Sequence, residues 1–250
     1  MLSKINFEKK KENFLHLLTP KAFLRLSPGS MRKENEGSRL NPEKAFAIDR
    51  MENLKNFETG NSLTLGFDYT GTKNNSNKFD FSVAQVISEI ENKKMNTKTG
   101  LDEKLSDLVG SGSFKINDKI SLTNQFAMDQ NYKELNYNDL GLNLELGNTN
   151  LVFNYIEEDK HIGNQEYFKT KISFKNQENS LIKFETKRNL ITNSSEFYDL
   201  SYEYINDCLR AGLVYRREFY NDSEIEAENS LMFNITLIPF GNIDSPKFNR

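Results

Sequence analysis

The feature that most constrains this chain is a repeated alternation of apolar and polar residues. From Leu63 to Tyr69 every second residue is apolar, and the residues between are polar or Gly. The stretch 199–220, DLSYEYINDCLRAGLVYRREFY, shows the same period of two, which breaks at Asn206-Asp207 and then resumes. Such alternation predicts β-strands with one apolar and one polar face. Either a protein core or lipid must cover the apolar face.

The alternation predicts an all-β, antiparallel fold of about twelve strands. Most of these segments are about nine to eleven residues long, which is the length that crosses a bilayer at a tilt of about 45°. Strands of soluble proteins average about five or six residues. The predicted strands are 21–26, 61–70, 79–89, 107–115, 119–129, 136–146, 150–157, 167–175, 180–189, 195–205, 208–219 and 230–239.

The connections between these strands alternate in kind. Short turns are expected at Asn117-Asp118, Gly147-Asn148, Asn176–Glu178 and Asn206-Asp207, and more polar, mostly longer loops at 90–106, 130–135, 158–166, 190–194 and 220–229. Short turns on one rim and longer loops on the other favour a transmembrane barrel with its short turns on the periplasmic side. The polar segment 27–60 lacks the alternation of the strands. It is predicted as one long loop on the same rim as the other longer loops.

The composition is consistent with one-sided strands. Only 36% of the 250 residues are hydrophobic, yet the chain has 19 Phe and 10 Tyr, which argue against disorder. The net charge of −3 suggests no nucleic-acid partner. The apolar patch Phe14–Leu18 is too short for the core of a signal peptide. A membrane barrel and a soluble sheet both remain open at this point.

Several phrases carry a resemblance to a known family. They are TPKAFLRLSPGSMR at 19–32, AFAIDRME at 45–52, GNSLTLGFDY at 60–69, LDEKLSDLVGSGSFKINDKISLTNQFAMDQNYKELNYNDLG at 101–141, EEDKHIGNQEYFKTKI at 157–172, FETKRNLITNSSEFYDLSYEYINDCLRAGLVYRREFYND at 184–222 and SLMFNITLIPFGNI at 230–243. Together they resemble the C-terminal barrel portion of the lipopolysaccharide-assembly family (LptD, also OstA or organic solvent tolerance), of alphaproteobacterial type. The resemblance implies a transmembrane β-barrel segment without enzymatic activity.

Proteins of that family have a signal peptide, a periplasmic jelly roll and a large barrel plugged by a lipoprotein. The resemblance therefore implies a translocon of the cell outer membrane that inserts lipopolysaccharide into the outer leaflet, with the signal peptide expected upstream of this chain. It implies an LptE-type lipoprotein plug and periplasmic lipopolysaccharide-bridge proteins as partners. We expect residues 1–20 to be an N-terminal remnant or linker, 21–241 the barrel region and 242–250 a tail.

The resemblance also assigns candidate sites. It implies that Cys208, the only cysteine, forms a disulfide with the N-terminal domain of a full-length protein. The last strand, 230–239, is expected to be one lip of a lateral gate, with candidate positions Leu231, Phe233, Ile235, Leu237 and Pro239. Charges expected in the lumen, where they would guide a phosphorylated lipid or form a balanced solvated face with Glu185 and Glu218, are Lys183, Lys187, Arg210 and Arg216.

No catalytic residue, metal or cofactor is predicted. His161 stands beside Glu157, Glu158 and Asp159, but no second His is close in sequence, which favours a solvated loop over a metal site. Two functions of other classes stay open, a self-contained twelve-stranded channel for small solutes and a soluble β-sheet binding protein. Dependence on detergent separates the soluble sheet from both barrel interpretations.

Overall fold

The structure, a computed structural model, describes the chain except residues 12, 36, 52–54, 74–76, 161–162, 177–178, 220–228, 239–240, 245–247 and 250. It divides into two compact units. Unit 1 comprises Met1–Leu140 with Ile156–Gln165, and unit 2 comprises Gly141–Tyr155 with Glu166–Arg250. Within the described part of the chain, no helix is both long enough and apolar enough to cross a membrane.

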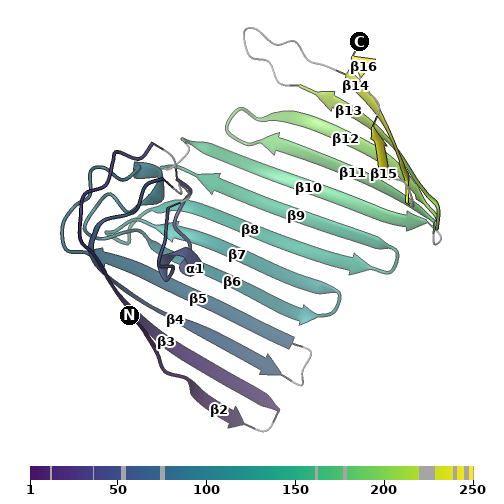
Figure 1. Cartoon of the computed structure of the whole chain (residues 1–250). Coiled ribbons are helices and arrows are strands. Elements are labelled where there is room, and N and C mark those ends of the chain that lie inside the picture. Colours follow the sequence, from purple (N-terminus) through teal and green to yellow (C-terminus); the bar gives the residue numbers. More distant parts are fainter. Residues whose placement is uncertain are drawn as a thin grey trace. The chain divides into compact units, whose positions relative to one another are not determined.

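Unit 1 is an antiparallel sheet whose long strands follow one another in chain order (Figure 1). Two strands, β8 (Leu135–Leu146) and β9 (Thr149–Glu158), contribute residues to both units. The other strands of unit 1 are β1 (Leu2–Lys4), β2 (Phe7–Lys11), β3 (Phe14–Ser27), β4 (Gly60–Lys73), β5 (Asn77–Ser88), β6 (Leu108–Asn117) and β7 (Ile120–Met128). A short helix, α1 (Pro42–Ala45), and a 3-10 turn, η1 (Thr97–Thr99), lie in its two longest loops.

Unit 2 continues the same pattern of neighbouring antiparallel strands. Its strands are β10 (Gln165–Asn176), β11 (Ser180–Asn189), β12 (Ser194–Ile205), β13 (Leu209–Glu218), β14 (Asn229–Leu237), β15 (Gly241–Asp244) and β16 (Phe248–Asn249). The last two are short and pair with β14 at separate places along it.

The prediction of an all-β, antiparallel fold is confirmed, and all twelve predicted strands are present as β3 to β14. Tight turns join β6 to β7 and β8 to β9, and loops 28–59 and 89–107 join the strands at the other end, as the sequence predicts. The main differences are at the termini. The 1–20 segment, expected as a linker, holds β1, β2 and the first half of β3, and the 242–250 tail includes most of β15 and all of β16.

Pro20 explains why the edge of unit 1 is divided into two short strands. β2 pairs with β3 over Phe14–Leu18, and β1 pairs with it over Lys21–Phe23. Pro20 lies in the interval between them and has no N–H to donate to a neighbouring strand, although its carbonyl accepts from the Ile5 N–H at 3.3 Å. The strand that we expected to begin at residue 21 therefore passes through the proline and begins at Phe14.

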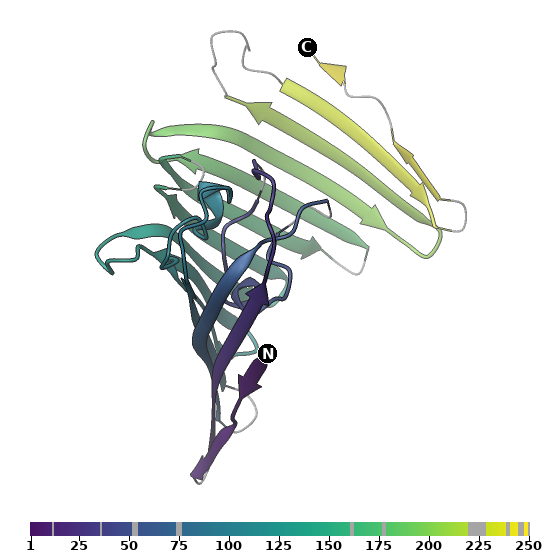
Figure 2. The same ribbon diagram turned by 60° about the vertical axis from the view of Figure 1, so that its left-hand side comes forward.

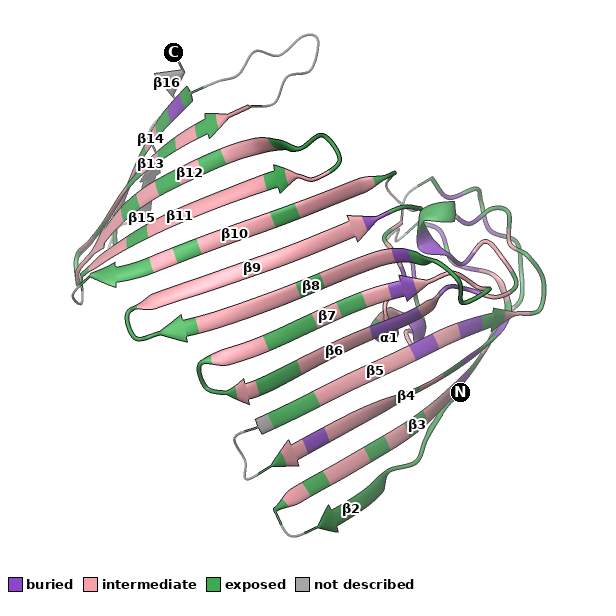
Figure 3. Ribbon diagram, turned by 180° about the vertical axis from the view of Figure 1, so that it is seen from behind, coloured by how far each residue is buried: buried purple, intermediate pink, exposed green. Residues whose placement is uncertain are grey.

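The buried core of unit 1 lies between its loops and the loop end of the sheet. Figure 3 shows the buried residues concentrated in this part of β4 to β8. Ala45 of α1 is fully buried, and the Thr64 hydroxyl of β4 donates to its carbonyl at 3.0 Å. The core residues are Met31, Leu40, Ala45, Met51, Ala84, Val86, Met95, Leu101, Val109 and Ala127.

Candidate functional site

The two faces of the sheet differ in what covers them. On one face, Leu63, Leu65 and Phe67 of β4 are exposed, and the register places Phe79 and Phe81 of β5 on the same side. The face with Ser62, Thr64 and Gly66 carries the loops instead. In unit 2, β12 and β13 place their predicted apolar residues on one common face. Exposed on it are Tyr198, Leu200, Tyr202, Leu213 and Tyr215, and half-buried are Tyr204, Leu209 and Ala211.

The long loop 28–59 is held on the polar face of unit 1 by a buried ion cluster. Glu58 of the loop accepts from Arg50 Nε at 2.8 Å, and Arg25 Nη1 of β3 lies 3.2 Å from its carboxylate. Arg25 Nε also donates to the Ile48 carbonyl at 3.1 Å. Arg50 Nη2 donates to the Ser62 hydroxyl of β4 at 3.0 Å. Because one carboxylate joins two guanidinium groups, the cluster ties the loop to both β3 and β4. Figure 2 shows the backbone of these two strands, coloured purple and blue, near the end marked N.

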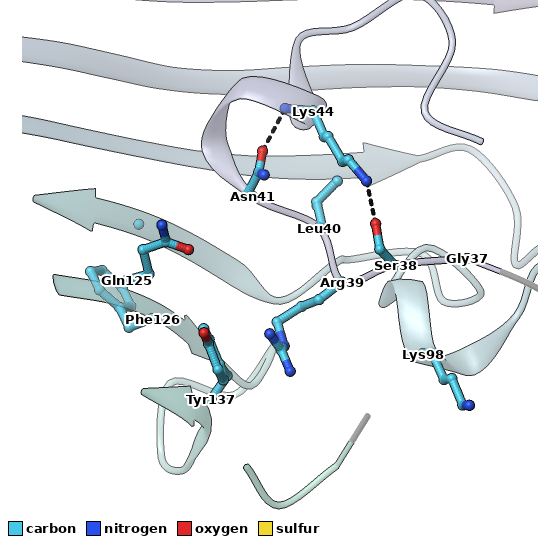
Figure 4. A pocket seen from close by; sticks show the side chains of 11 residues that line it. Gly37, Ser38, Arg39, Leu40, Asn41, Lys44, Lys98, Gln125, Phe126 and Tyr137 are labelled. Carbon is cyan, nitrogen blue, oxygen red and sulfur yellow. Dashed lines mark hydrogen bonds between the residues drawn. The ribbon is translucent and has the colours of Figure 1, made fainter. Parts of the chain in front are cut away.

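A cavity of about 460 Å³ lies where this loop meets the sheet, entirely within unit 1. Figure 4 shows the side chains that line it, among them Arg39 and Lys44 of the loop, Gln125 of β7 and Tyr137 of β8. The Arg39 guanidinium stacks on the Tyr137 ring, with its central carbon 3.5 Å from the ring centroid, and forms an ion pair with Glu158. Burial lowers the pKa of Arg39, so the surroundings compensate its charge only in part.

The predicted charges of unit 2 lie together on the polar face, and each pairs with a carboxylate. Lys183 lies 3.1 Å from Glu203, and Arg210 lies 2.8 Å from the same side chain. Lys187 lies 2.8 Å from Glu196. Arg216 donates from Nε and Nη2 to Asp199 at 2.7 and 2.6 Å. This arrangement matches the balanced face that the sequence left open, while the role of these charges in guiding lipid stays a prediction.

Cys208 lies exposed in the turn between β12 and β13 as a free thiol. Its N–H donates to Asn206 Oδ1 at 3.0 Å, and its carbonyl accepts from the Ile238 N–H at 3.1 Å. The backbone of the turn is therefore fixed while the side chain faces outward. The position suits a bond to another domain, and the disulfide stays a prediction.

The strand expected as the gate lip is β14, where Leu231, Phe233 and Leu237 are exposed and Ile235 is half-buried. The outer edge of β14 is paired with two later segments of the chain. β15 pairs with Asn234–Leu237, and β16 pairs with Ser230 and Leu231. The chain reverses after Leu237, and its own C-terminal residues bond to edge groups that would otherwise lack partners. Pro239, like His161, lies outside the described residues.

The comparisons with known proteins decide the family. A family model described as "LptD: LPS transport system D" matches residues 1–185, most of the chain. The chain belongs to the LptD family. This family membership confirms the resemblance seen in the sequence, connects the chain to lipopolysaccharide transport and associates it with a membrane. By its description, LptD is a transport family.

Two further comparisons add little. No curated protein matches the chain. Among solved structures, a mutant of Rh. blastica porin is similar at 7% identity and a TM-score of 0.39, over 100% of this chain and 100% of that one. A similarity of this extent carries no argument about function.

Sequence reasoning missed the cavity and the ion cluster, although a signal for the covered region is present. In the stretch 83–87, VAQVI, the alternation fails because Ala84 and Val86 are apolar on the otherwise polar face. Leu108-Val109 and Phe126-Ala127 show the same failure. Apolar residues on both faces of a strand indicate that both faces are covered. Among the described residues, no group of three or more His, Cys, Asp or Glu is placed to hold a metal ion.

Proposed function

We propose that this chain forms part of the wall of an outer-membrane translocon that inserts lipopolysaccharide into the outer leaflet. The observation that carries the proposal is that large apolar side chains are exposed on one face of the sheet, whereas polar side chains on the other face of unit 1 are buried. Large apolar side chains such as Leu65 and Leu200 are 45% and 51% exposed, whereas polar-face residues such as Thr64 are buried under the loops. In water the apolar face would be the covered one, so lipid is the medium that fits this sheet.

Neighbouring residues on opposite faces of β12 provide the test. Ser201 lies on the polar face and Leu200 on the apolar face. A photoreactive amino acid at position 201 of the full-length protein, in cells that make lipopolysaccharide, is expected to crosslink to lipopolysaccharide. The same group at position 200 is expected to crosslink mainly to phospholipid. Crosslinking of lipopolysaccharide at 200 but not at 201 would contradict the proposal.

The polar face of unit 2 is the surface we assign to an LptE-type lipoprotein plug. Among the described residues of this unit only Ser230 is buried, at 8% exposed, so the chain covers little of this face itself. The expected result is that the plug co-purifies with the full-length protein and is lost when residues 60–240 are deleted. If the plug binds equally well after that deletion, this part of the barrel is not its platform.

We assign the exposed thiol of Cys208 to a disulfide with the N-terminal domain of the full-length protein. With this disulfide the full-length protein should migrate differently on reducing and non-reducing gels. Changing Cys208→Ser is expected to abolish that difference. Thermal unfolding of the 250-residue chain should be unchanged by the substitution, because the side chain has no buried contacts to lose. A full-length protein whose mobility shift survives the change does not use Cys208 in this way.

A further inference from the structure

The end of unit 1 opposite its long loops is rich in lysine. At this end of the sheet β2 leads into β3, β4 into β5 and β6 into β7 (Figure 1). In the sequence, the segments 8–13, 73–78 and 115–119 at these connections contain seven Lys and three acidic residues. The turn segments of unit 2, 175–180 and 205–209, contain one Lys and two acidic residues. The excess of positive charge is therefore specific to unit 1.

A row of rings crosses the apolar face at the same end of the sheet. It consists of Phe14 of β3, Tyr69 of β4, Phe79 of β5 and Phe114 of β6, with His16 between the first two. The His16 Nδ1 lies 2.7 Å from the Tyr69 hydroxyl, and the Phe79 ring centroid is 6.1 Å from that of Phe114. In membrane barrels, rows of aromatic side chains mark the level of the lipid headgroups. This row indicates that the short turns of unit 1 lie at the surface of a bilayer.

Three lysines extend from the apolar face beside this row. The register places Lys9 of β2 opposite His16. It also places Phe14 between Lys11 of β2 and Lys73 of β4. Because paired residues of neighbouring strands point to the same face, these lysines share the face of the rings. All three are exposed, and none forms an ion pair with a carboxylate in the part of the chain that the structure describes.

Ammonium groups beside an aromatic row suit an anionic phospholipid. A lysine packs its methylene groups on an apolar surface and extends its charged end toward water, so Lys9, Lys11 and Lys73 can reach the headgroup phosphates. Cations close to a bilayer surface attract anionic lipids. Since these lysines lie on the face that lipid covers, a headgroup can reach them without any further protein. Lys78 differs, because it is already paired with Asp80 at 2.9 Å.

We infer that this end of unit 1 binds anionic phospholipid headgroups through Lys9, Lys11 and Lys73 beside the aromatic row. The inference rests on the proposed function only for the lipid that covers the apolar face. Short turns of such barrels lie on the periplasmic side. Under the proposed function, these headgroups therefore belong to the leaflet opposite to the one that receives lipopolysaccharide.

The test uses one tryptophan as a local reporter, because the chain has none of its own. Phe79→Trp places it in the aromatic row, and Phe174→Trp places it on the apolar face of β10 near the turn that follows. The two phenylalanines are 38% and 41% exposed, so the reporters are matched. The 250-residue chain is folded into vesicles of equal phosphatidylcholine and phosphatidylglycerol, of which one or the other carries brominated acyl chains. Bromine quenches nearby tryptophan, so the ratio of the two quenching efficiencies measures the local lipid composition.

At Phe79→Trp we expect brominated phosphatidylglycerol to quench more strongly, which corresponds to a local enrichment of about threefold. At Phe174→Trp the two lipids should quench alike. The triple change Lys9→Gln, Lys11→Gln and Lys73→Gln should remove the enrichment at position 79. Raising the salt concentration to about 0.5 M should reduce it as well, because the charges involved are exposed and therefore screened.

The matched control removes three exposed lysines from the other end of unit 1, by Lys93→Gln, Lys94→Gln and Lys98→Gln in loop 89–107. It changes the net charge equally and should leave the enrichment unchanged, and circular dichroism checks that every variant keeps its strands. Equal quenching by both lipids at position 79, the same enrichment at position 174, or an enrichment that survives the triple change overturns the inference alone. If neither lipid quenches either tryptophan, the apolar face does not lie in lipid and the proposed function fails as well.

Discussion

Unit 1 and unit 2 have the same kind of apolar face but differ in how their polar faces are covered. In unit 1, loops 28–59 and 89–107 lie over the polar face and bury a small core against it. In unit 2 the described loops are shorter, and paired charges occupy the same face with little burial. The apolar faces are alike in their exposure, whereas the covering of each polar face depends on the loops beside it. The following experiments test this difference.

The largest expected effect is at Glu58, whose loss leaves two guanidinium groups buried without a carboxylate. Removing one partner of a buried ion pair lowers the free energy of unfolding by about 3–5 kcal/mol. Glu58→Ala should therefore release loop 28–59 from the sheet, seen as protease cleavage in the loop and a lower unfolding midpoint in detergent. The matched change in unit 2 is Glu203→Ala, which also has two cationic partners.

Glu203→Ala should cost less than about 1 kcal/mol, because its partners are partly exposed and water replaces the lost carboxylate. The Arg210 side chain is 54% exposed, whereas that of Arg50 is fully buried. Equal losses in the two variants would show that coverage by the loop does not distinguish the two polar faces.

The apolar faces should respond alike in the two units. Leu65 of β4 and Leu200 of β12 lie near the middle of their strands and are exposed to a similar extent. Replacing either with Arg should cost about 2–4 kcal/mol for folding into lipid vesicles. Urea titration of the folded fraction in vesicles measures this cost. A large loss in one unit alone would mean that the two apolar faces lie in different media.

Replacing glycine with alanine should again affect the stability of the two units differently. A Cβ at Gly66, under the loop of unit 1, would overlap the Val83 carbonyl oxygen and approach the Phe46 ring. Gly66→Ala should therefore cost about 1–3 kcal/mol. At Gly212 the nearest atom to a new Cβ is the Tyr202 carbonyl oxygen at 4.0 Å, so Gly212→Ala should be neutral or slightly stabilising. The unfolding midpoint of each variant in detergent measures the effect. Equal losses in Gly66→Ala and Gly212→Ala would contradict this prediction.

The smallest expected effect is a dependence on pH in one loop of unit 1. The Lys133 N–H, then those of Glu134 and Asn131, hold the pKa of Asp129 below its usual range. The carboxylate form stabilises the loop above the ordinary Asp pKa of about 3.9. This contribution is lost as the pH falls through the lowered value of the folded state.

Amide exchange at Lys133 and Glu134 should therefore speed up at acid pH beyond its intrinsic change. The loop after β11 provides the control, because there the neutral Asn189 side chain accepts from the Thr192 N–H at 3.1 Å. Exchange of the Thr192 N–H should therefore change with pH only as the intrinsic exchange rate does. Identical pH profiles in the two loops would exclude Asp129 as the titrating group.

Much of the fold follows from local sequence because side-chain direction in a strand repeats every two residues. The alternation around Leu200 and Leu213 therefore predicts which residues share a face, and polar pairs such as Gly147-Asn148 predict where the chain turns. β3 begins at Phe14 rather than at the predicted residue 21, because a proline is tolerated where an edge partner is interrupted.

The strands, their two faces and the order of turns and loops can be predicted from the sequence, since each depends on residues within about ten positions of one another. What covers each polar face is seen only in the folded chain. Arg25 meets Glu58 across the long loop, and Arg39 meets Glu158 from a strand more than a hundred positions further along the chain. No local pattern encodes such contacts, because they form only when the sheet brings distant segments together.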